Sequence, residues 1–305
     1  MKRRQFIKKS SIVTVGACAM PVTSSVNELP TPFRIIHLTD CHVDTKGVAE
    51  TGLRRALEKI NNLDKKPDFI LNGGDAIFDA MEATKGDAKA QWSLWHSVLK
   101  NNNSLPIHAC IGNHDIYGWG SLDNPTKSNI MSGKQWAMDE LGMKKRYYSF
   151  DHNDWHFVVL DSVQFQDKGY TVELDEEQWE WLEKDLTASK DKFTCILSHV
   201  PLLSFCHQLF KIGQDGKLIT LPQGILMNSQ PLEIKNLIYQ HPQVKLCIAG
   251  HLHMQEEIEY LNVKYLCNGA VCGNWWKGAF QEFEPAFTII DLFPDGTSKH
   301  EWVTY

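Results

Sequence analysis

Residues 109–118, ACIGNHDIYG, place an amide, an imidazole and a carboxylate directly after an apolar run. The apolar residues of 106–111 predict a buried strand. Gly, Asn and Asp are also the commonest turn formers, so this stretch alone is equally compatible with a plain turn. The other strand ends of the chain decide between a turn and a functional loop.

Four other predicted strands, at 33–39, 67–72, 192–198 and 243–249, also end in polar residues of this kind. Helical periodicity between the strands predicts parallel pairing with crossover helices. Ligands bind at the carboxyl ends of the strands of such sheets. We therefore expect these strand-end residues to converge: Asp40, His42, Asp75, Asn113, His114, His199, His251 and His253. Isolated ionised groups are too costly to bury, and imidazole with carboxylate suits Zn, Fe or Mn better than Ca.

The remaining pattern predicts an α/β fold in which two sheets share a core and helices lie outside. Helices are expected at 50–63, 90–100 and 175–186, where Asp175 and Gln178 have capping-box spacing. Further strands are expected within 106–111, 146–152, 155–162, 263–270, 286–293 and 299–305. Residues 202–227 form a long loop, a length that is usually functional. We assign 33–305 to one domain.

The first residues have the pattern of a targeting segment. Lys2-Arg3-Arg4-Gln5-Phe6-Ile7-Lys8, followed by small and apolar residues, resembles a twin-arginine export signal over 1–19. The alternative is a disordered basic tail. A small-residue cleavage site around Cys18 and a lipobox that would leave Cys18 lipidated both remain open. With 20–32 as a linker, we expect a bacterial protein exported to the periplasm or cell envelope.

Composition limits the partners. The chain has 305 residues, 43% of them apolar, and a formal net charge of −6, which becomes −11 without the five basic residues of the predicted signal. Such acidity disfavours long nucleic acids but not a small phosphoester. No apolar stretch reaches the roughly 18 residues of a membrane helix. The cysteines lack a CxxC pattern; Cys267 and Cys272 are close enough in sequence to pair, but no disulfide framework is indicated. Nothing indicates the oligomeric state.

The ordered set of strand-end motifs resembles the calcineurin-like metallophosphoesterases. The resemblance implies a four-layer α-β-β-α sandwich with two mixed sheets and a dinuclear centre of Mn, Fe or Zn at the strand ends. One ion would be held by Asp40, His42, Asp75 and His253, and the other by Asp75, Asn113, His199 and His251. A metal-bridging hydroxide would attack phosphorus directly, without a phospho-enzyme.

The resemblance also implies roles for the two residues after Asn113. His114 would stabilise the phosphoryl group or protonate the leaving oxygen as a general acid. Asp115 would orient His114; alternatively, it is a simple turn or cap carboxylate.

Two departures bear on the substrate. Phe78 stands where purple acid phosphatases carry a tyrosine, and Ile111 stands where phosphoprotein phosphatases carry an arginine. Outside the predicted signal, the arginines lie away from the motifs: Arg34, Arg54, Arg55 and Arg146. A bidentate arginine suits the dianion of a monoester, so its absence favours phosphodiesters. The alternatives are a broad-specificity phosphomonoesterase and a non-catalytic binding module on the same fold.

Residues 268–278, NGAVCGNWWKG, follow the last predicted ligands, and exported bacterial members of the family often end in a similar stretch. The tryptophans would stack on a flat part of the substrate, and the lysine would meet phosphate; a purely structural aromatic pair is the alternative. The candidate substrate residues are Trp275, Trp276, Lys277, Tyr117 and His207.

Overall fold

The computed structural model describes residues 31–120, 130–167, 169–209 and 224–305. A five-stranded sheet has the order β13-β12-β1-β2-β3. Its strands are β1 (Phe33–Leu38), β2 (Phe69–Asn72), β3 (Ile107–Ala109), β12 (Ala286–Leu292) and β13 (Ser298–Thr304). β1, β2 and β3 run parallel, whereas β12 is antiparallel to both of its neighbours.

The second sheet has six strands in the order β10-β11-β9-β8-β5-β4. They are β4 (Tyr148–His152), β5 (Trp155–Val159), β8 (Phe193–Leu197), β9 (Val244–Ala249), β10 (Glu256–Tyr260) and β11 (Val263–Cys267). β5, β8, β9 and β11 are parallel, with an antiparallel strand at each edge. A separate hairpin pairs β6 (Val163–Gln166) with β7 (Gly169–Val172).

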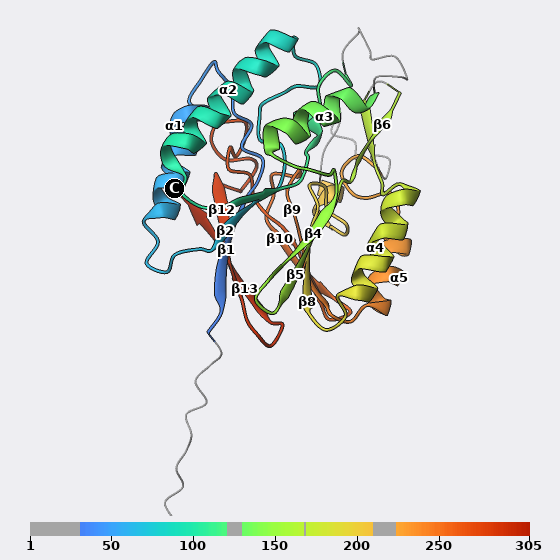
Figure 1. The fold of residues 1–305 in the computed structure, drawn as a ribbon. Helices are drawn as coiled ribbons and strands as arrows, with labels where there is room; N and C mark the ends of the chain where they lie inside the picture. Colours follow the sequence, from blue (N-terminus) through green and yellow to red (C-terminus); the bar gives the residue numbers. More distant parts are fainter. Residues whose placement is uncertain (1–30, 121–129, 168, 210–223) are drawn as a thin grey trace, which may run out of the picture. The chain divides into compact units, whose positions relative to one another are not determined.

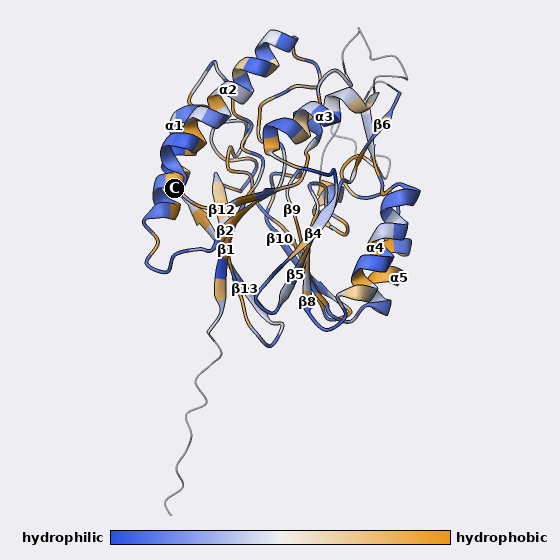
Figure 2. Cartoon of the chain, in the orientation of Figure 1, coloured by the Kyte–Doolittle hydropathy of each residue, from blue (hydrophilic) through white to orange (hydrophobic). Residues whose placement is uncertain are grey.

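Alternating side chains build the layers. In β1, Ile35 packs into the core between the sheets, while Ile36 packs on the helix side. Helices α1 (Ala49–Asn61) and α2 (Lys85–Asn102) cover that side of the first sheet, and α4 (Glu176–Ala188) and α5 (Pro231–Gln240) cover the outer face of the second. Figure 1 shows the two sheets between these helices, and Figure 2 shows apolar strands beside helices whose outer faces are hydrophilic. The predicted α-β-β-α arrangement is confirmed.

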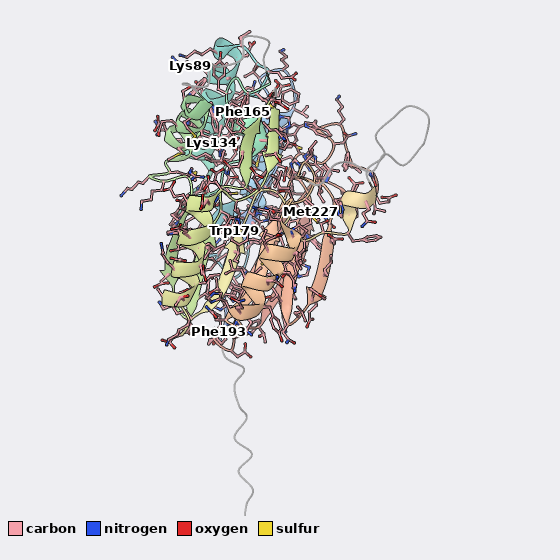
Figure 3. The ribbon with its side chains drawn as sticks, turned by 90° about the vertical axis from the view of Figure 1, so that its right-hand side faces the viewer. Lys89, Lys134, Phe165, Trp179, Phe193 and Met227 are labelled. Atoms are coloured by element: carbon pink, nitrogen blue, oxygen red, sulfur yellow. The ribbon has the colours of Figure 1, made fainter. Side chains whose placement is uncertain are left out.

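Several elements were not predicted from the sequence. These are α3 (Ile130–Leu141), α5, β10 and the β6–β7 hairpin, on which Phe165 is labelled in Figure 3. At α4, Asp175 caps the backbone N–H of Gln178 as predicted. The reciprocal bond is missing, because the Gln178 side chain binds the backbone of Asp161 instead.

Part of the predicted organisation lies outside the described residues. This applies to the export signal at 1–19, to Cys18, to nearly all of the linker at 20–32, and to residues 210–223 of the long loop. Within the described ranges, no helix combines the length and apolarity needed to cross a bilayer.

Candidate metal centre

The strand ends of both sheets meet at one edge. Backbone bonds join the segments that follow β1 and β2: the Asp40 N–H donates to Gly74 O and the His42 N–H donates to Asp75 O. The backbone N–H of His251, after β9, donates to the Asp40 carboxylate at 2.9 Å, which ties the second sheet to the first. The fold thus brings together residues as far apart as 40 and 251.

The first group of predicted ligands surrounds a pair of imidazoles. The Nε2 atoms of His42 and His253 are 3.2 Å apart. Asp75 Oδ2 lies 3.6 Å from His42 Nε2, and Asp40 Oδ1 lies 3.5 Å from His253 Nε2. All four side chains are buried.

The second group shares Asp75 with the first. His199 Nε2 lies 3.2 Å from Asp75 Oδ2, 3.1 Å from Asn113 Oδ1 and 3.2 Å from His251 Nδ1. The structure therefore gathers all seven predicted ligands into two adjoining groups, with Asp75 between them.

Each imidazole has its other nitrogen next to a backbone carbonyl. His253 Nδ1 lies 2.6 Å from Gly273 O, and His199 Nδ1 lies 2.7 Å from Gly73 O. His251 is turned the other way, with Nε2 3.0 Å from Ile225 O, and His42 Nδ1 lies 3.4 Å from Phe78 O. A carbonyl accepts a hydrogen bond, so a neutral ring that donates to it leaves a lone pair on the nitrogen that faces the other imidazole. Two such lone pairs 3.2 Å apart repel unless a proton or a metal ion lies between them, so the donor set fits two metal ions.

The pKa shifts of the buried groups also favour a bound cation. Burial lowers the pKa of His42 and of His251 to about 3 each. Burial also acts to lower the pKa of His199, but the neighbouring Asp75 carboxylate raises it to about 9. Burial acts to raise the pKa of Asp40, yet the hydrogen bond and charge of His253 hold it below its ordinary value. The carboxylates therefore stay ionised and favour positive charge at this edge.

The backbone at this edge is strained. Five of the seven ligand candidates have positive φ values, between 41° and 67°: Asp40, His42, Asp75, His251 and His253. The left-handed region costs a side-chain-bearing residue about 1–2 kcal/mol, and such strain clusters at functional sites. A Cβ on Gly112 would lie 2.1 Å from Asp75 Oδ1, so only glycine lets the GNHD loop approach this carboxylate.

The hydrogen bonds of Asp115 match the alternative interpretation, a turn carboxylate, and not the orientation of His114. Both of its carboxylate oxygens accept backbone N–H groups, from Gly112, Asp75 and Ala76, at 2.9 Å each. Asp115 therefore fixes the Asp75 turn and does not contact the His114 ring. The carboxylate near that ring belongs to Asp79, whose Oδ1 lies 3.8 Å from His114 Nδ1. An acid four residues after Asp75 on the same loop was the available sequence signal for it.

His114 lies beside the first group. Its ring meets His42 edge-on, with the ring centroids 4.8 Å apart, and it remains partly exposed. Its backbone N–H donates to Asp75 Oδ1 at 2.8 Å, which places the imidazole next to the shared carboxylate.

The two predicted substrate tryptophans point in different directions. The Trp275 ring covers His253, with centroids 4.5 Å apart, and lies 5.7 Å from His42. Trp276 packs against α1 at Gly52, and its indole N–H donates to His42 O at 3.0 Å. Trp276 is thus a structural anchor, which matches the alternative interpretation of this residue and not the substrate role. Lys277 is exposed.

The other two predicted rim residues are also held elsewhere. Tyr117 packs edge-on against Trp136 of α3, with ring centroids 5.2 Å apart. His207 belongs to the short 3-10 helix Cys206–Leu209, and its Nδ1 lies 2.6 Å from Ser204 O, two residues before that helix. Neither has a described contact with the ligand groups. Tyr170 on β7 was missed: its ring lies 6.3 Å from that of His251.

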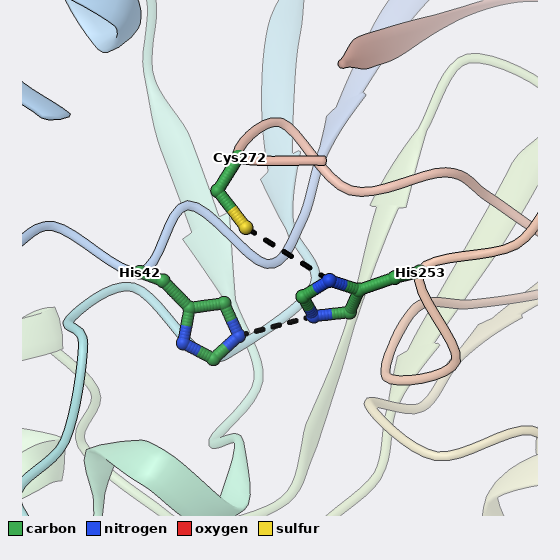
Figure 4. Close-up of side chains that lie close together, drawn as sticks. All are labelled: His42, His253 and Cys272. Atoms are coloured by element: carbon green, nitrogen blue, oxygen red, sulfur yellow. Dashed lines mark hydrogen bonds between the residues drawn. The ribbon is translucent and has the colours of Figure 1, made fainter. Parts of the chain in front are cut away.

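Cys272 lies behind the first group. Its Sγ is 3.9 Å from His253 Nδ1, the nitrogen that faces Gly273 O, and not from the nitrogen that faces His42 (Figure 4). The thiol therefore contacts the back of a ligand ring. Cys267 and Cys272 are not joined by a disulfide, and the Cys267 thiol donates to Gly250 O.

The sequence matches the calcineurin-like phosphoesterase family over residues 33–255, which include all seven ligand candidates and His114. The chain belongs to this family. It is accordingly a metallophosphoesterase, a hydrolase of phosphoric esters, with the mixed two-sheet fold of its structural neighbours.

Relatives within the family differ in activity. A 3',5'-cyclic-nucleotide phosphodiesterase of Nostoc, alr5338, is 26% identical over 90% of this chain and 94% of its own length. The human serine/threonine-protein phosphatase CPPED1 is 24% identical over 71% of this chain and 63% of its own length. The Escherichia coli cyclic-AMP phosphodiesterase CpdA is 25% identical over 54% of this chain and 56% of its own length. Among solved structures, a dimetal phosphatase from Danio rerio superimposes with a TM-score of 0.61 at 15% identity, over 90% of this chain and 99% of that one.

Proposed function

We propose that the protein is a dinuclear-metal phosphodiesterase that acts on small phosphodiesters. The observation that carries the metal requirement is the two pairs of facing imidazole nitrogens, each 3.2 Å apart and each beside Asp75. Mn, Zn and Fe are the ions that this donor set suits.

The seven ligand candidates would hold two ions. Asp40, His42 and His253 would hold one, Asn113, His199 and His251 the other, and Asp75 both. When bound, the ions supply Lewis acidity toward the phosphoryl oxygens and acidify water. His114 donates a proton to the leaving oxygen, and Asp79, whose Oδ1 lies 3.8 Å from His114 Nδ1, positions the ring.

The preference for diesters rests on the arginines. Arg34 forms a bidentate pair with Asp291, and Arg146 binds Asp161, Asp175 and Glu177. Arg54 pairs with Glu58 on α1, and Arg55 is an exposed residue of the same helix. Among the described residues, none of these guanidinium groups has a contact at the metal edge, so a dianionic monoester has no bidentate partner there. The cyclic-nucleotide activity named for the Nostoc relative supports the same choice.

The test compares bis(4-nitrophenyl) phosphate with 4-nitrophenyl phosphate after the apo-protein has been loaded with Mn, Zn or Fe. We expect about two ions per chain and a larger kcat/KM for the diester. A larger kcat/KM for the monoester would establish the alternative, a broad-specificity phosphomonoesterase. The dimetal phosphatase from Danio rerio, which has a similar fold, is named as a phosphatase. A chain that takes up no metal would overturn both.

We further propose that residues 1–19 export the protein to the periplasm or cell envelope. Arg3 and Arg4, followed by Phe6 and Ile7, support this proposal. Replacing both arginines by lysine should retain the full-length protein in the cytoplasm of a bacterial host, as measured by fractionation. Metabolic labelling with palmitate would distinguish a lipidated Cys18 from simple cleavage. Unchanged export of the variant would refute the assignment.

A further inference from the structure

We propose that Trp275 is a specificity residue that stacks on an aromatic ring in the retained half of a phosphodiester substrate. The proposal rests on the proposed function and narrows it to diesters whose retained group is an aryl ester or a nucleoside. Two observations support the proposal: the Trp275 ring contacts the ligand rings His42 and His253, and neighbouring contacts hold the loop that carries it.

Trp275 forms one wall of the metal edge. Its ring is tilted by 32° over His253, and Phe280 meets it nearly perpendicularly, with centroids 5.9 Å apart. Phe280 also contacts His253 at 5.6 Å. Trp275 is partly exposed, so part of the residue packs on the ligand rings and part remains accessible at the metal site.

The loop that carries Trp275 is held firmly. Both tryptophans have positive φ values, 47° for Trp275 and 66° for Trp276. Trp276 is anchored on α1 and on His42 O, and its backbone N–H donates to Cys272 O at 2.8 Å. Such strain persists only where the surroundings impose it, so the backbone that carries Trp275 is held in one conformation.

The ring contacts assign different neighbours to the two ester groups of a substrate. His114 and Trp275 both contact the His42 ring, with centroids 4.8 and 5.7 Å from it, and Trp275 also extends over His253. In the proposed reaction the leaving oxygen faces the proton donor, His114. We assign the group that stays on phosphorus to the side of His253 and Trp275. Stacking of a flat ring on an indole contributes about 1–3 kcal/mol and tolerates any π face.

The experiment varies only the retained group. Methyl 4-nitrophenyl phosphate and bis(4-nitrophenyl) phosphate share one leaving group. With Trp275→Ala, we expect KM to rise about tenfold for the bis-aryl diester and less than about twofold for the methyl diester, and Trp275→Phe should restore most of the difference. Tyr239→Ala, which removes an exposed aromatic ring on α5, serves as the control. Metal content is measured in each variant, because Trp275 touches His253.

Equal changes for both diesters, or no change for either, would overturn the proposal. A second measurement is independent of turnover: calorimetry of phenylphosphonate and methylphosphonate binding to the metal-loaded protein. We expect the phenyl compound to bind about tenfold more tightly, and Trp275→Ala to abolish this preference. If the intact protein hydrolyses neither diester, the proposed function fails, and the phosphonate comparison still decides the role of Trp275.

Discussion

The two ends of the second sheet hold buried histidines in opposite ways. At the amino end of the strands, His156 of β5 pairs with Asp151 and lies opposite Thr194 near the start of β8. Its Nδ1 lies 2.7 Å from Asp151 and its Nε2 lies 2.8 Å from Asp185, so both nitrogens have carboxylate partners. At the carboxyl end, His199 and His251 face each other with nitrogens 3.2 Å apart. Both ring nitrogens of His156 thus have partners within the protein. The facing nitrogens of His199 and His251 form instead a site that fits a cation.

The largest effect should follow from removing the carboxylate that both groups share. Asp75→Asn is expected to lower kcat/KM more than about 1,000-fold, because a shared charge near two ions contributes several kcal/mol to catalysis. Metal content per chain, measured by mass spectrometry, should fall in parallel. Asp291→Asn, at the partly buried pair with Arg34 and outside the ligand set, is the control and should retain both ions. Full activity in Asp75→Asn would contradict the claim that the carboxyl end of the sheet, unlike the amino end, requires a bound cation.

The next effect concerns His114 and depends on the leaving group. His114→Ala should lower kcat about 1,000-fold for diesters with an alkoxide leaving group, which needs a proton, and far less for 4-nitrophenolate. Both ions should remain bound, because His114 lies outside the seven-residue ligand set. Rate constants for a series of leaving groups give a steeper dependence on leaving-group pKa in the variant. An unchanged slope would rule out proton donation.

Asp79→Asn should have a smaller effect of the same kind. The substitution removes the charge 3.8 Å from His114 Nδ1 but preserves the oxygen that accepts the Met81 N–H at 2.8 Å. We expect kcat to fall about tenfold with KM unchanged. In the double variant with His114→Ala, the loss should not exceed that of His114→Ala alone, because the two residues act as one unit. Additive losses would assign Asp79 a separate role.

The sequence predicted the metal ligands better than the other residues of the site. Ligands such as Asp75 and Asn113 follow directly on buried strands, and strand direction is enough to place them together. The two interpretations of Asp115 stayed open, because its carboxylate accepts N–H groups of the Asp75 turn, a tertiary contact that spacing does not encode. Trp275 and Trp276 were not distinguished, because a left-handed backbone at consecutive tryptophans is imposed by the surrounding fold. The helix α5 and the β6–β7 hairpin were not predicted either, because they depend on tertiary packing that the hydrophobic periodicity of the sequence does not show.

The smallest effect is expected at the amino end, and it concerns stability alone. Burial acts to lower the pKa of His156, but the hydrogen bonds that its ring donates to Asp185 and Asp151 raise it above its ordinary value. A raised pKa in the folded state stabilises the protein fully below the unfolded value of about 6.5, and this contribution is lost as the pH rises through the folded value. His156→Gln should therefore reduce the free energy of unfolding by about 2 kcal/mol at pH 6 and by less at pH 9, as measured by urea titration.

The matched control for that measurement is His96→Gln. His96 also faces a carboxylate, that of Glu140 at 2.7 Å, but its side chain is 47% exposed against 8% for His156. Exposed pairs contribute little, so the control should change the free energy of unfolding by less than about 0.5 kcal/mol at either pH. Metal content and kcat should be unchanged in both variants, since neither histidine lies at the carboxyl end. A pH-independent loss in His156→Gln would mean that packing, and not the charged pair, holds the amino end together.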